Sequence, residues 1–168
     1  MVRFGSVEDG LRRSRSGPLP ASPPVVAFAF AGEGGQHVDM GIALYERFPV
    51  FRETIARLDA DFARLTGTSL VRDHGFCTAM DPEVLADLRI AGPCTMMVQL
   101  ATAALLEQTF AIQPALVFGH SYGELAAACA CGALKFEEVI TTFSQAGVPA
   151  GRMLSLGAGV EVAHALLD

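Results

Sequence analysis

Residues 115–128 have the sequence Ala115-Leu116-Val117-Phe118-Gly119-His120-Ser121-Tyr122-Gly123-Glu124-Leu125-Ala126-Ala127-Ala128. In this segment an apolar run is followed by Gly-His-Ser-Tyr-Gly and then by an alanine-rich run. A serine between two glycines, at the turn from a buried strand to a helix, is the pattern of a nucleophile elbow. The glycines on either side of Ser121 leave room where a side chain would clash with the tight turn. The pattern predicts that Ser121 is an acyl-accepting nucleophile.

The residues around this motif support the same interpretation. Pro114 precedes the apolar strand, and a helix-forming run from Glu124 to Cys131 follows the serine. A helix that begins here directs its first N–H groups and the positive end of its dipole toward the place where an oxyanion would develop. The segment therefore predicts acyl transfer or hydrolysis of an ester or thioester.

The composition is that of an ordinary folded domain. The chain has 168 residues, of which 51% are hydrophobic, so it can bury a sizeable core. Its net charge of -6 and its scattered basic residues predict no nucleic-acid partner. The four cysteines match neither a zinc site nor a disulfide-rich secreted domain. We find no apolar run long enough to cross a bilayer and no signal peptide, so we expect a cytoplasmic protein without membrane or metal.

The order of the segments divides the chain into three parts. Residues 1–24 are rich in Ser, Pro, Gly and Arg, which predicts a disordered leader or linker. Residues 25–150 combine apolar strands with helices and predict an α/β core with a parallel sheet. In residues 151–168, a strand at 153–156 and a helix at 160–167 predict the beginning of a further, incomplete unit.

The first strand of the core is predicted at Val25–Phe30, a continuous apolar run that suits a strand buried on both faces. It leads into a glycine-rich turn, Gly32-Glu33-Gly34-Gly35-Gln36. This turn lacks the Lys-Ser/Thr ending of a P-loop and the third glycine of a dinucleotide-binding fingerprint. We therefore expect no nucleotide at this turn.

Helical periodicity predicts most of the remaining elements. Helices are expected at residues 37–47, after Pro49, from Asp81 to Leu88, from Thr95 to Phe110 and from Lys135 to Gln145. The helix after Pro49 carries a stripe that we expect to lie in the core, formed by Phe51, Ile55, Leu58 and Phe62. Residues 66–82 are rich in turns and indicate no chemistry, because His74 and Cys77 lack the further ligands of a metal site.

Three blocks of the sequence resemble the malonyl-CoA:acyl carrier protein transacylase family, which includes the acyltransferase domains of polyketide and fatty acid synthases. The likeness extends from about Val25 to the end of the chain. The blocks are Phe28–Gln36 followed by Met40-Gly41 and Leu44-Tyr45, Gly119–Glu124 with its alanine-rich helix and Gly132-Ala133-Leu134, and Gly151–Gly157. The resemblance implies a hydrolase-like parallel-sheet core, with residues 151–168 as only the start of a small ferredoxin-like subdomain.

The resemblance also implies an activity. In this family the serine takes an acyl group, malonyl-type or simple, from coenzyme A and passes it to the phosphopantetheine thiol of an acyl carrier protein, in polyketide or fatty acid biosynthesis. Ser121 would carry the ester, and the backbone N–H groups of Glu33 and Tyr122 would form the oxyanion hole. His120 and Gln36 would line the substrate pocket. Acyl-CoA is then a substrate, and no cofactor is bound.

The sequence departs from the family pattern at functional positions. Glu33 replaces a glutamine and places a carboxylate near the developing oxyanion, which we expect to slow the reaction. Gly92 precedes Pro93 where the family has glutamine. Ala146 stands where the family has an arginine that pairs with the free carboxylate of dicarboxylic acyl groups.

In the family, the catalytic histidine lies further along the sequence from the serine than the last residue of this chain. The histidines present are His37, His74, His120 and His164, and we expect none of them to act as the base. Without a base, a serine hydroxyl is a weak nucleophile. We therefore expect weak activity, or activity that depends on a second polypeptide supplying the missing subdomain.

Two other functions stay open at this point. A hydrolase or thioesterase of the α/β-hydrolase type shares the Gly-His-Ser-Tyr-Gly motif, but it needs an acid and a histidine after the serine. A non-catalytic docking domain would keep the elbow only as a structural turn, and the altered positions at Glu33 and Ala146 favour this alternative. The acyltransferase remains the first hypothesis, with acyl-CoA and an acyl carrier protein as its partners.

Overall fold

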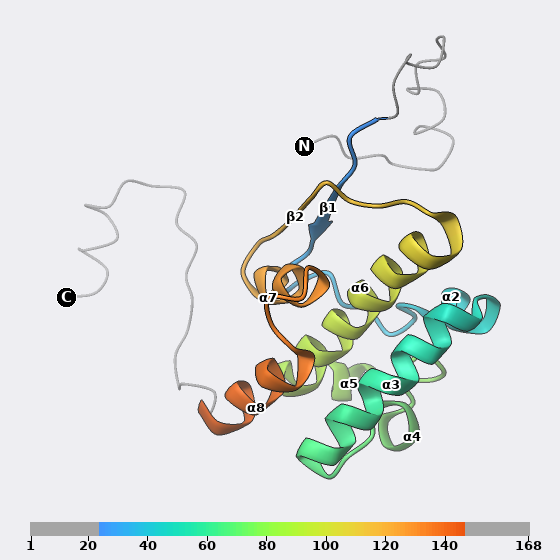
Figure 1. Ribbon diagram of the computed structural model, residues 1–168. Coiled ribbons are helices and arrows are strands. Elements are labelled where there is room, and N and C mark those ends of the chain that lie inside the picture. Colours follow the sequence, from blue (N-terminus) through green and yellow to red (C-terminus); the bar gives the residue numbers. More distant parts are fainter. Residues whose placement is uncertain (1–23, 147–168) are drawn as a thin grey trace, which may run out of the picture.

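The computed structural model describes residues 24–146 (Figure 1). Their elements follow in the order β1 (Ala27–Phe30), α2 (Ile42–Arg47), α3 (Pro49–Thr66), α4 (Leu70–His74), α5 (Pro82–Leu85), α6 (Leu88–Phe110), β2 (Leu116–Gly119), α7 (Tyr122–Ala130) and α8 (Phe136–Ala146). The predicted leader up to Pro23, the predicted strand and helix of residues 151–168, and His164 lie outside the described residues.

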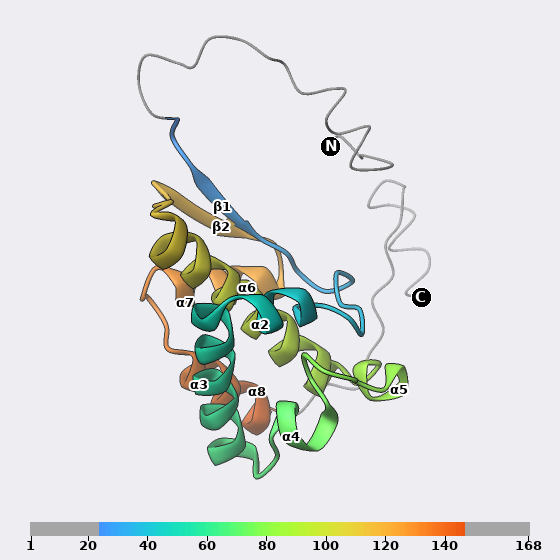
Figure 2. The same cartoon turned by 90° about the vertical axis from the view of Figure 1, so that its right-hand side faces the viewer.

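β1 and β2 form a parallel pair, with Ala27 opposite Leu116 and Phe30 opposite Gly119. The two views in Figures 1 and 2 show this small sheet at one end of a body made of helices. Helices α2 to α6 lie between the two strands in sequence, as a parallel connection requires. The predicted α/β class with a parallel sheet is thus confirmed.

The two faces of this sheet differ in their environment. Phe28 and Phe30 are buried against the helices, whereas Leu116 and Phe118 are 58% and 51% exposed. The prediction of a strand buried on both faces is therefore wrong within the described residues, because no described helix covers the second face. β1 also begins later than predicted, at Ala27.

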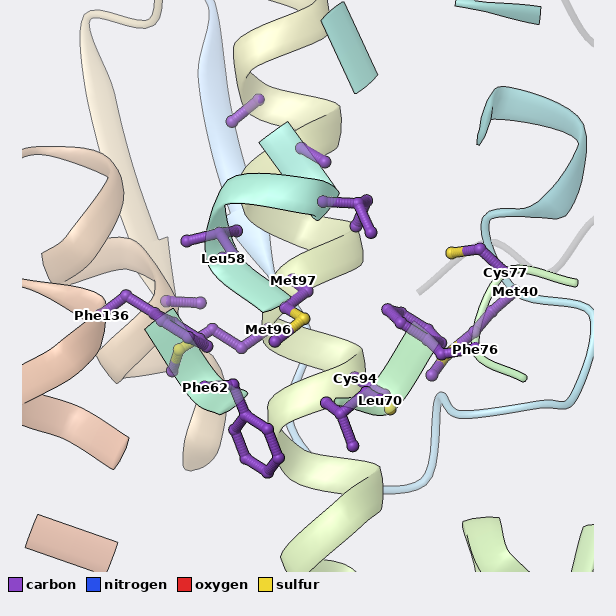
Figure 3. Close-up of a cluster of buried hydrophobic side chains, with 14 of the residues drawn as sticks. Met40, Leu58, Phe62, Leu70, Phe76, Cys77, Cys94, Met96, Met97 and Phe136 are labelled. Atoms are coloured by element: carbon purple, nitrogen blue, oxygen red, sulfur yellow. The ribbon is translucent and has the colours of Figure 1, made fainter. Parts of the chain in front are cut away.

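The core lies between α3 and α6, which pack along each other. The predicted stripe of α3 is confirmed as buried: Phe51, Ile55, Leu58 and Phe62. Figure 3 shows Leu58 and Phe62 beside α6, whose Met96 and Met97 are fully buried. Burying each such side chain contributes about 1.5–3 kcal/mol to folding, so this helix pair is the main source of stability in the described fold.

α6 begins at Leu88, earlier than the predicted Thr95, and runs through Gly92 and Pro93. The predicted boundary is wrong because the side chain of Asp87 caps the helix, accepting a hydrogen bond from the backbone N–H of Arg89 at 2.9 Å. Pro93 lies inside this helix, where it has no backbone N–H to donate.

With 23 residues, α6 is also long and apolar enough to cross a membrane by length and composition. This finding corrects the expectation that no apolar run reaches that length. Half of its most apolar window is buried inside the domain, where the helix packs against α3 and α7. A core helix of a folded domain passes the same test, so the length of α6 is weak evidence for a membrane.

Two shorter elements also differ from the prediction. The helix expected from His37 begins only at Ile42, because Gly41 takes a left-handed backbone conformation with φ of 85°. α4 forms within residues 66–82, where only turns were expected. The helix expected from Asp81 to Leu88 is present as α5 but ends at Leu85, and the helix expected from Lys135 is present as α8.

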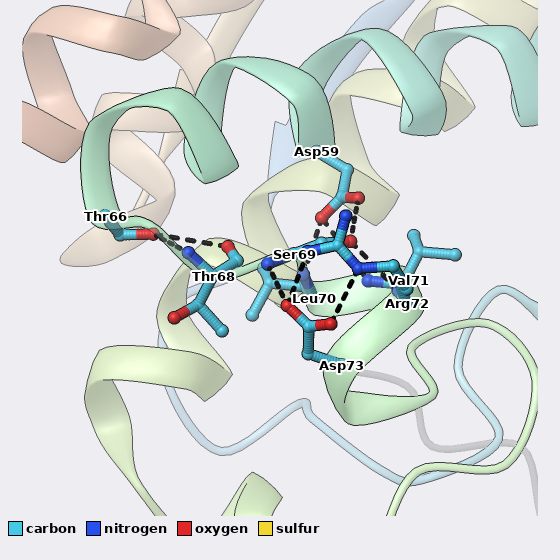
Figure 4. A network of polar contacts seen from close by, with 8 residues as sticks. All are labelled: Asp59, Thr66, Thr68, Ser69, Leu70, Val71, Arg72 and Asp73. Atoms are coloured by element: carbon cyan, nitrogen blue, oxygen red, sulfur yellow. Dashed lines mark hydrogen bonds and ion pairs between the residues drawn. The ribbon is translucent and has the colours of Figure 1, made fainter.

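A buried carboxylate explains why α4 forms (Figure 4). Asp59 of α3 accepts hydrogen bonds from Ser69 Oγ and from the backbone N–H of Leu70, both at 2.6 Å. It also accepts a longer bond from the N–H of Val71, at 3.3 Å. Ser69 Oγ in turn caps α4 by accepting from the N–H of Arg72 at 2.9 Å. The start of α4 therefore depends on a residue of the preceding helix, α3.

We expect thiol labelling to separate the cysteines into two classes. Cys77 and Cys94 are buried, whereas Cys131 is exposed. Burial raises the pKa of the Cys77 thiol to about 12 and also raises the pKa of Cys94. Because the thiolate is the reactive form, iodoacetamide at about pH 8 should modify Cys131 first and the buried pair only after unfolding in urea. Peptide mass spectrometry measures this order, and rapid labelling of native Cys77 would contradict it.

Candidate active site

Ser121 lies in the turn between β2 and α7, where its backbone has φ of 55° and ψ of -124°. A positive φ of this kind is rare for a residue other than glycine and is a form of strain found at functional sites. The turn is closed by two backbone hydrogen bonds of 2.9 Å, from the N–H of Gly123 to His120 and from the N–H of Glu124 to Ser121. Ser121 itself is exposed. The strand, sharp turn and helix of a nucleophile elbow are all present.

The two glycines of the motif are required by close backbone contacts. A Cβ atom on Gly119 would lie 2.1 Å from the carbonyl oxygen of Gly123. A Cβ atom on Gly123 would lie 2.3 Å from the carbonyl oxygen of Phe30 in β1. Both distances are shorter than any real contact of a Cβ atom, so the reason given for these glycines from the sequence is confirmed.

The first glycine-rich loop lies directly against the elbow. A Cβ atom on Gly32 would be 2.6 Å from the carbonyl oxygen of His120 and 3.3 Å from the Cβ atom of Ser121. The N–H of His120 also donates to the carbonyl of Phe30, at 3.3 Å. Glu33, next to Gly32, is exposed. The structure thus brings together the two segments whose N–H groups would form an oxyanion hole according to the family resemblance.

Gln36 stabilises the same loop through a hydrogen bond. Its Oε1 atom accepts a hydrogen bond from the backbone N–H of Gly34 at 2.8 Å. It also lines a cavity of about 10 Å³ together with Glu33, Gly92 and Tyr122. A cavity of that size holds about one water molecule, so it is too small for an acyl group in this conformation.

Gln99 has a role that the sequence analysis missed. Its Nε2 atom donates to the carbonyl oxygen of Ala31 at 3.0 Å and so ties the start of the first loop to α6. Its Oε1 atom is buried and has no hydrogen-bond partner within residues 24–146. The available signal was a polar residue in the middle of the apolar run Met96–Leu106.

The ring of Tyr122 packs against α6 at Gly92, which has no side chain. A Cβ atom on Gly92 would lie 3.0 Å from Cζ of the Tyr122 ring. Burial is the main reason why the pKa of the Tyr122 phenol is raised, with smaller effects of the cysteines nearby and of Glu33. The phenol therefore stays protonated at neutral pH. Gly92 therefore leaves the space that this ring occupies.

The histidines within the described residues do not pair with Ser121. His120 is exposed and lies beside the first loop, with its Nδ1 atom 3.3 Å from the position of a Cβ atom on Gly32. His37 is exposed, and His74 lies at the end of α4. Across residues 24–146, no group of three or more His, Cys, Asp or Glu side chains is placed to hold a metal.

Comparison with known proteins gives a consistent result. The family model of the acyl transferase domain matches residues 27–149. The highly reducing polyketide synthase stpks1 of Strobilurus tenacellus is 40% identical over 135 residues, which are 76% of this chain and 5% of that protein. The chain thus corresponds to a small part of the length of this relative.

Solved structures of acyltransferases share the fold. The acyl transferase domain of ZmaA is similar with a TM-score of 0.64 and 29% identity, over 70% of this chain and 27% of that chain. A malonyl-transacylase in complex with its type II PKS acyl carrier protein, PlMCAT:AntF, gives a TM-score of 0.60 and 25% identity, over 70% of this chain and 36% of that chain.

Proposed function

This chain belongs to the acyl transferase domain family, of the polyketide synthase and malonyl-CoA:acyl carrier protein transacylase type, and on that premise we propose that it carries an acyl group on Ser121. The acyl group comes from coenzyme A and passes to an acyl carrier protein. One observation carries this proposal: Ser121 is exposed in a sharp turn with a positive φ, and this turn lies against the first glycine-rich loop.

The proposed cycle has two half-reactions. First, Ser121 Oγ attacks the thioester carbon and gives its proton to a general base. The bond between the carbonyl carbon and the coenzyme A sulfur breaks, and the departing sulfur takes that proton. Then the phosphopantetheine thiol of the carrier protein attacks the ester on Ser121 and gives its proton to the base. The base returns the proton to Oγ as the new thioester leaves.

The described residues supply the nucleophile and the proposed oxyanion donors. Those donors are the backbone N–H groups of Glu33 and Tyr122, and the positive end of the α7 dipole lies at the same place. His120 and Gln36 line the pocket in this proposal. The general base comes from outside residues 24–146, because no described histidine pairs with Ser121.

The proposal is tested by acylation of the full chain. After incubation with acetyl-CoA or malonyl-CoA, peptide mass spectrometry should find the acyl group on Ser121, and addition of a holo carrier protein should remove it. Ser121→Ala should abolish the modification. Thr142→Ala, which removes an exposed hydroxyl on α8, is the matched control and should leave it intact.

Other results would favour the alternative functions. Steady hydrolysis of a nitrophenyl ester that depends on Ser121, without transfer to the carrier protein, would indicate a hydrolase. Binding of the carrier protein that survives Ser121→Ala, with no acylation of the wild-type chain by either thioester, would overturn the catalytic role and indicate a docking domain.

A further inference from the structure

The peptide group between Ala31 and Gly32 lies at the junction of the first glycine-rich loop and the elbow. On one side, the carbonyl oxygen of Ala31 would be 2.7 Å from a Cβ atom on Gly123 of α7. On the other side, a Cβ atom on Gly32 would be 3.3 Å from the Cβ atom of Ser121. A rotation of this peptide group would therefore move the loop relative to the nucleophile.

Gln99 of α6 holds this peptide group in one direction. Its Nε2 atom donates a hydrogen bond to the carbonyl oxygen of Ala31 at 3.0 Å. A peptide group is planar, so a fixed carbonyl also fixes the direction of the N–H of Gly32. The hydrogen bond from the N–H of Gly34 to Gln36, by contrast, lies within the loop and does not join it to a helix. The bond from Gln99 thus sets the direction in which the loop leaves β1.

The amide group of Gln99 has a partner at only one of its two ends within residues 24–146. Its Nε2 atom faces Ala31, whereas its Oε1 atom is buried and has no hydrogen-bond partner there. The reversed orientation would place two acceptor oxygens against each other. Buried polar atoms are nearly always paired, so an unpaired one is exceptional. A position that served packing alone would favour an apolar side chain.

We infer that Gln99 is a positioning residue for acyl transfer, because its hold on the Ala31 carbonyl keeps the backbone N–H of Glu33 directed at the oxyanion. The inference rests on the proposed function, in which this N–H is one of two oxyanion donors. Gln99 itself does not touch the acyl group. Its effect belongs to the step in which charge develops on the carbonyl oxygen, and not to the binding of the thioester.

A role in stability alone makes a different prediction for Gln99→Met. This substitution keeps the length of the side chain, but it removes both the donor to Ala31 and the unpaired acceptor. An unsatisfied buried acceptor destabilises a fold, so the melting temperature should be unchanged or higher in the variant. The amides of Gly32 to Gly35 should nevertheless exchange their hydrogens faster, because the loop has lost its bond to α6.

The kinetics of acylation measure the catalytic consequence. The full chain is incubated with a range of concentrations of acetyl-CoA or malonyl-CoA, and the acyl group on Ser121 is followed by mass spectrometry. In Gln99→Met the maximal rate should fall roughly tenfold, which is less than the hundredfold or greater loss expected when an oxyanion donor is removed outright. The half-saturating concentration should stay within about twofold of the wild-type value, because binding is not affected.

Two further variants show whether the donor is responsible. Gln99→Glu keeps the shape of the side chain but places an oxygen against the Ala31 carbonyl, so it should slow acylation at least as much as Gln99→Met. Gln108→Met is the matched control, because it makes the same change at an exposed position of the same helix. It should change neither the exchange of the loop amides nor the rate. Circular dichroism checks that each variant is folded.

Four outcomes would overturn the inference. Two are loop amides that exchange at the wild-type rate in Gln99→Met, and acylation of that variant at the wild-type rate. The third is a lower melting temperature together with the lower rate, which would assign Gln99 to stability. The fourth is a raised half-saturating concentration with an unchanged maximal rate, which would assign it to thioester binding.

Failure of the proposed function gives a different result. A wild-type chain that neither thioester acylates would overturn the role of Ser121 and, with it, the catalytic consequence of Gln99. The exchange of the loop amides would still decide whether Gln99 holds the loop in place.

Discussion

Gly123→Ala is expected to destabilise the fold and to remove acylation of Ser121 at the same time. The new Cβ atom would meet the carbonyl oxygens of Phe30 and Ala31 at 2.3 Å and 2.7 Å, and both belong to backbone that cannot turn away as a side chain can. β1 and α7 must therefore move apart. Overpacking of this kind costs about 3 kcal/mol or more. The displacement also separates Ser121 from the first loop.

Both effects can be measured on the same variant. Thermal unfolding should show a melting temperature lower by roughly 6–12 °C for a chain of this size. The rate of acylation should fall at least about a hundredfold, because small displacements of catalytic groups cost that much. Gly35→Ala is the matched control, since its Cβ atom would meet nothing closer than 4.0 Å. A Gly123→Ala variant with unchanged stability would show that the elbow packs differently.

Asp59→Ala is expected to have the largest effect on stability among changes to the polar residues that the structure describes. The substitution leaves Ser69 Oγ and the backbone N–H of Leu70 without their 2.6 Å partner in a buried setting. Losing hydrogen bonds to a charged acceptor costs about 1.5–3 kcal/mol each, so a total of roughly 3 kcal/mol or more is expected. α4 should also exchange its amide hydrogens faster, because its anchor on α3 is lost.

Urea unfolding and hydrogen exchange check this result. Asp61→Ala provides a control on the same helix, because Asp61 makes only an exposed pair with Arg64 at 3.4 Å. Exposed pairs contribute little, so this control should lower the free energy of unfolding by less than about 1 kcal/mol. If the two variants unfold at the same urea concentration, the buried network in Figure 4 does not hold α4 in place.

Local sequence patterns predicted the elements whose causes are local. The apolar stripe of α3 and the turn at Ser121 follow from spacing and from two glycines, and both are present. α4 was missed because its start is fixed by Asp59 from another helix. The predicted start of α6 at Thr95 was wrong, because the cap at Asp87 starts the helix at Leu88.

The candidate site also combines features that could be predicted with features that the sequence analysis missed. The family resemblance implied that the loop of Glu33 and the elbow of Ser121 lie together, and the close approach of Gly32 to His120 places the two segments side by side. It did not predict that Gln99 ties this loop to α6, or that the Tyr122 ring packs on Gly92. These contacts join positions far apart in the chain, and the one local signal, a glutamine within an apolar run, does not identify its partner. The catalytic roles of these residues stay proposals.

The pairing of β1 with β2 also sets the order in which the molecule acquires its shape. Ala27 meets Leu116 only after five helices have been synthesised between them. Helices form from neighbouring residues within about a microsecond, whereas contacts between remote segments wait for the chain to close on itself. During translation, β1 therefore leaves the ribosome without its neighbour. The elbow is assembled late, and nascent chains that stop before Gly119 contain the helical core but no nucleophile.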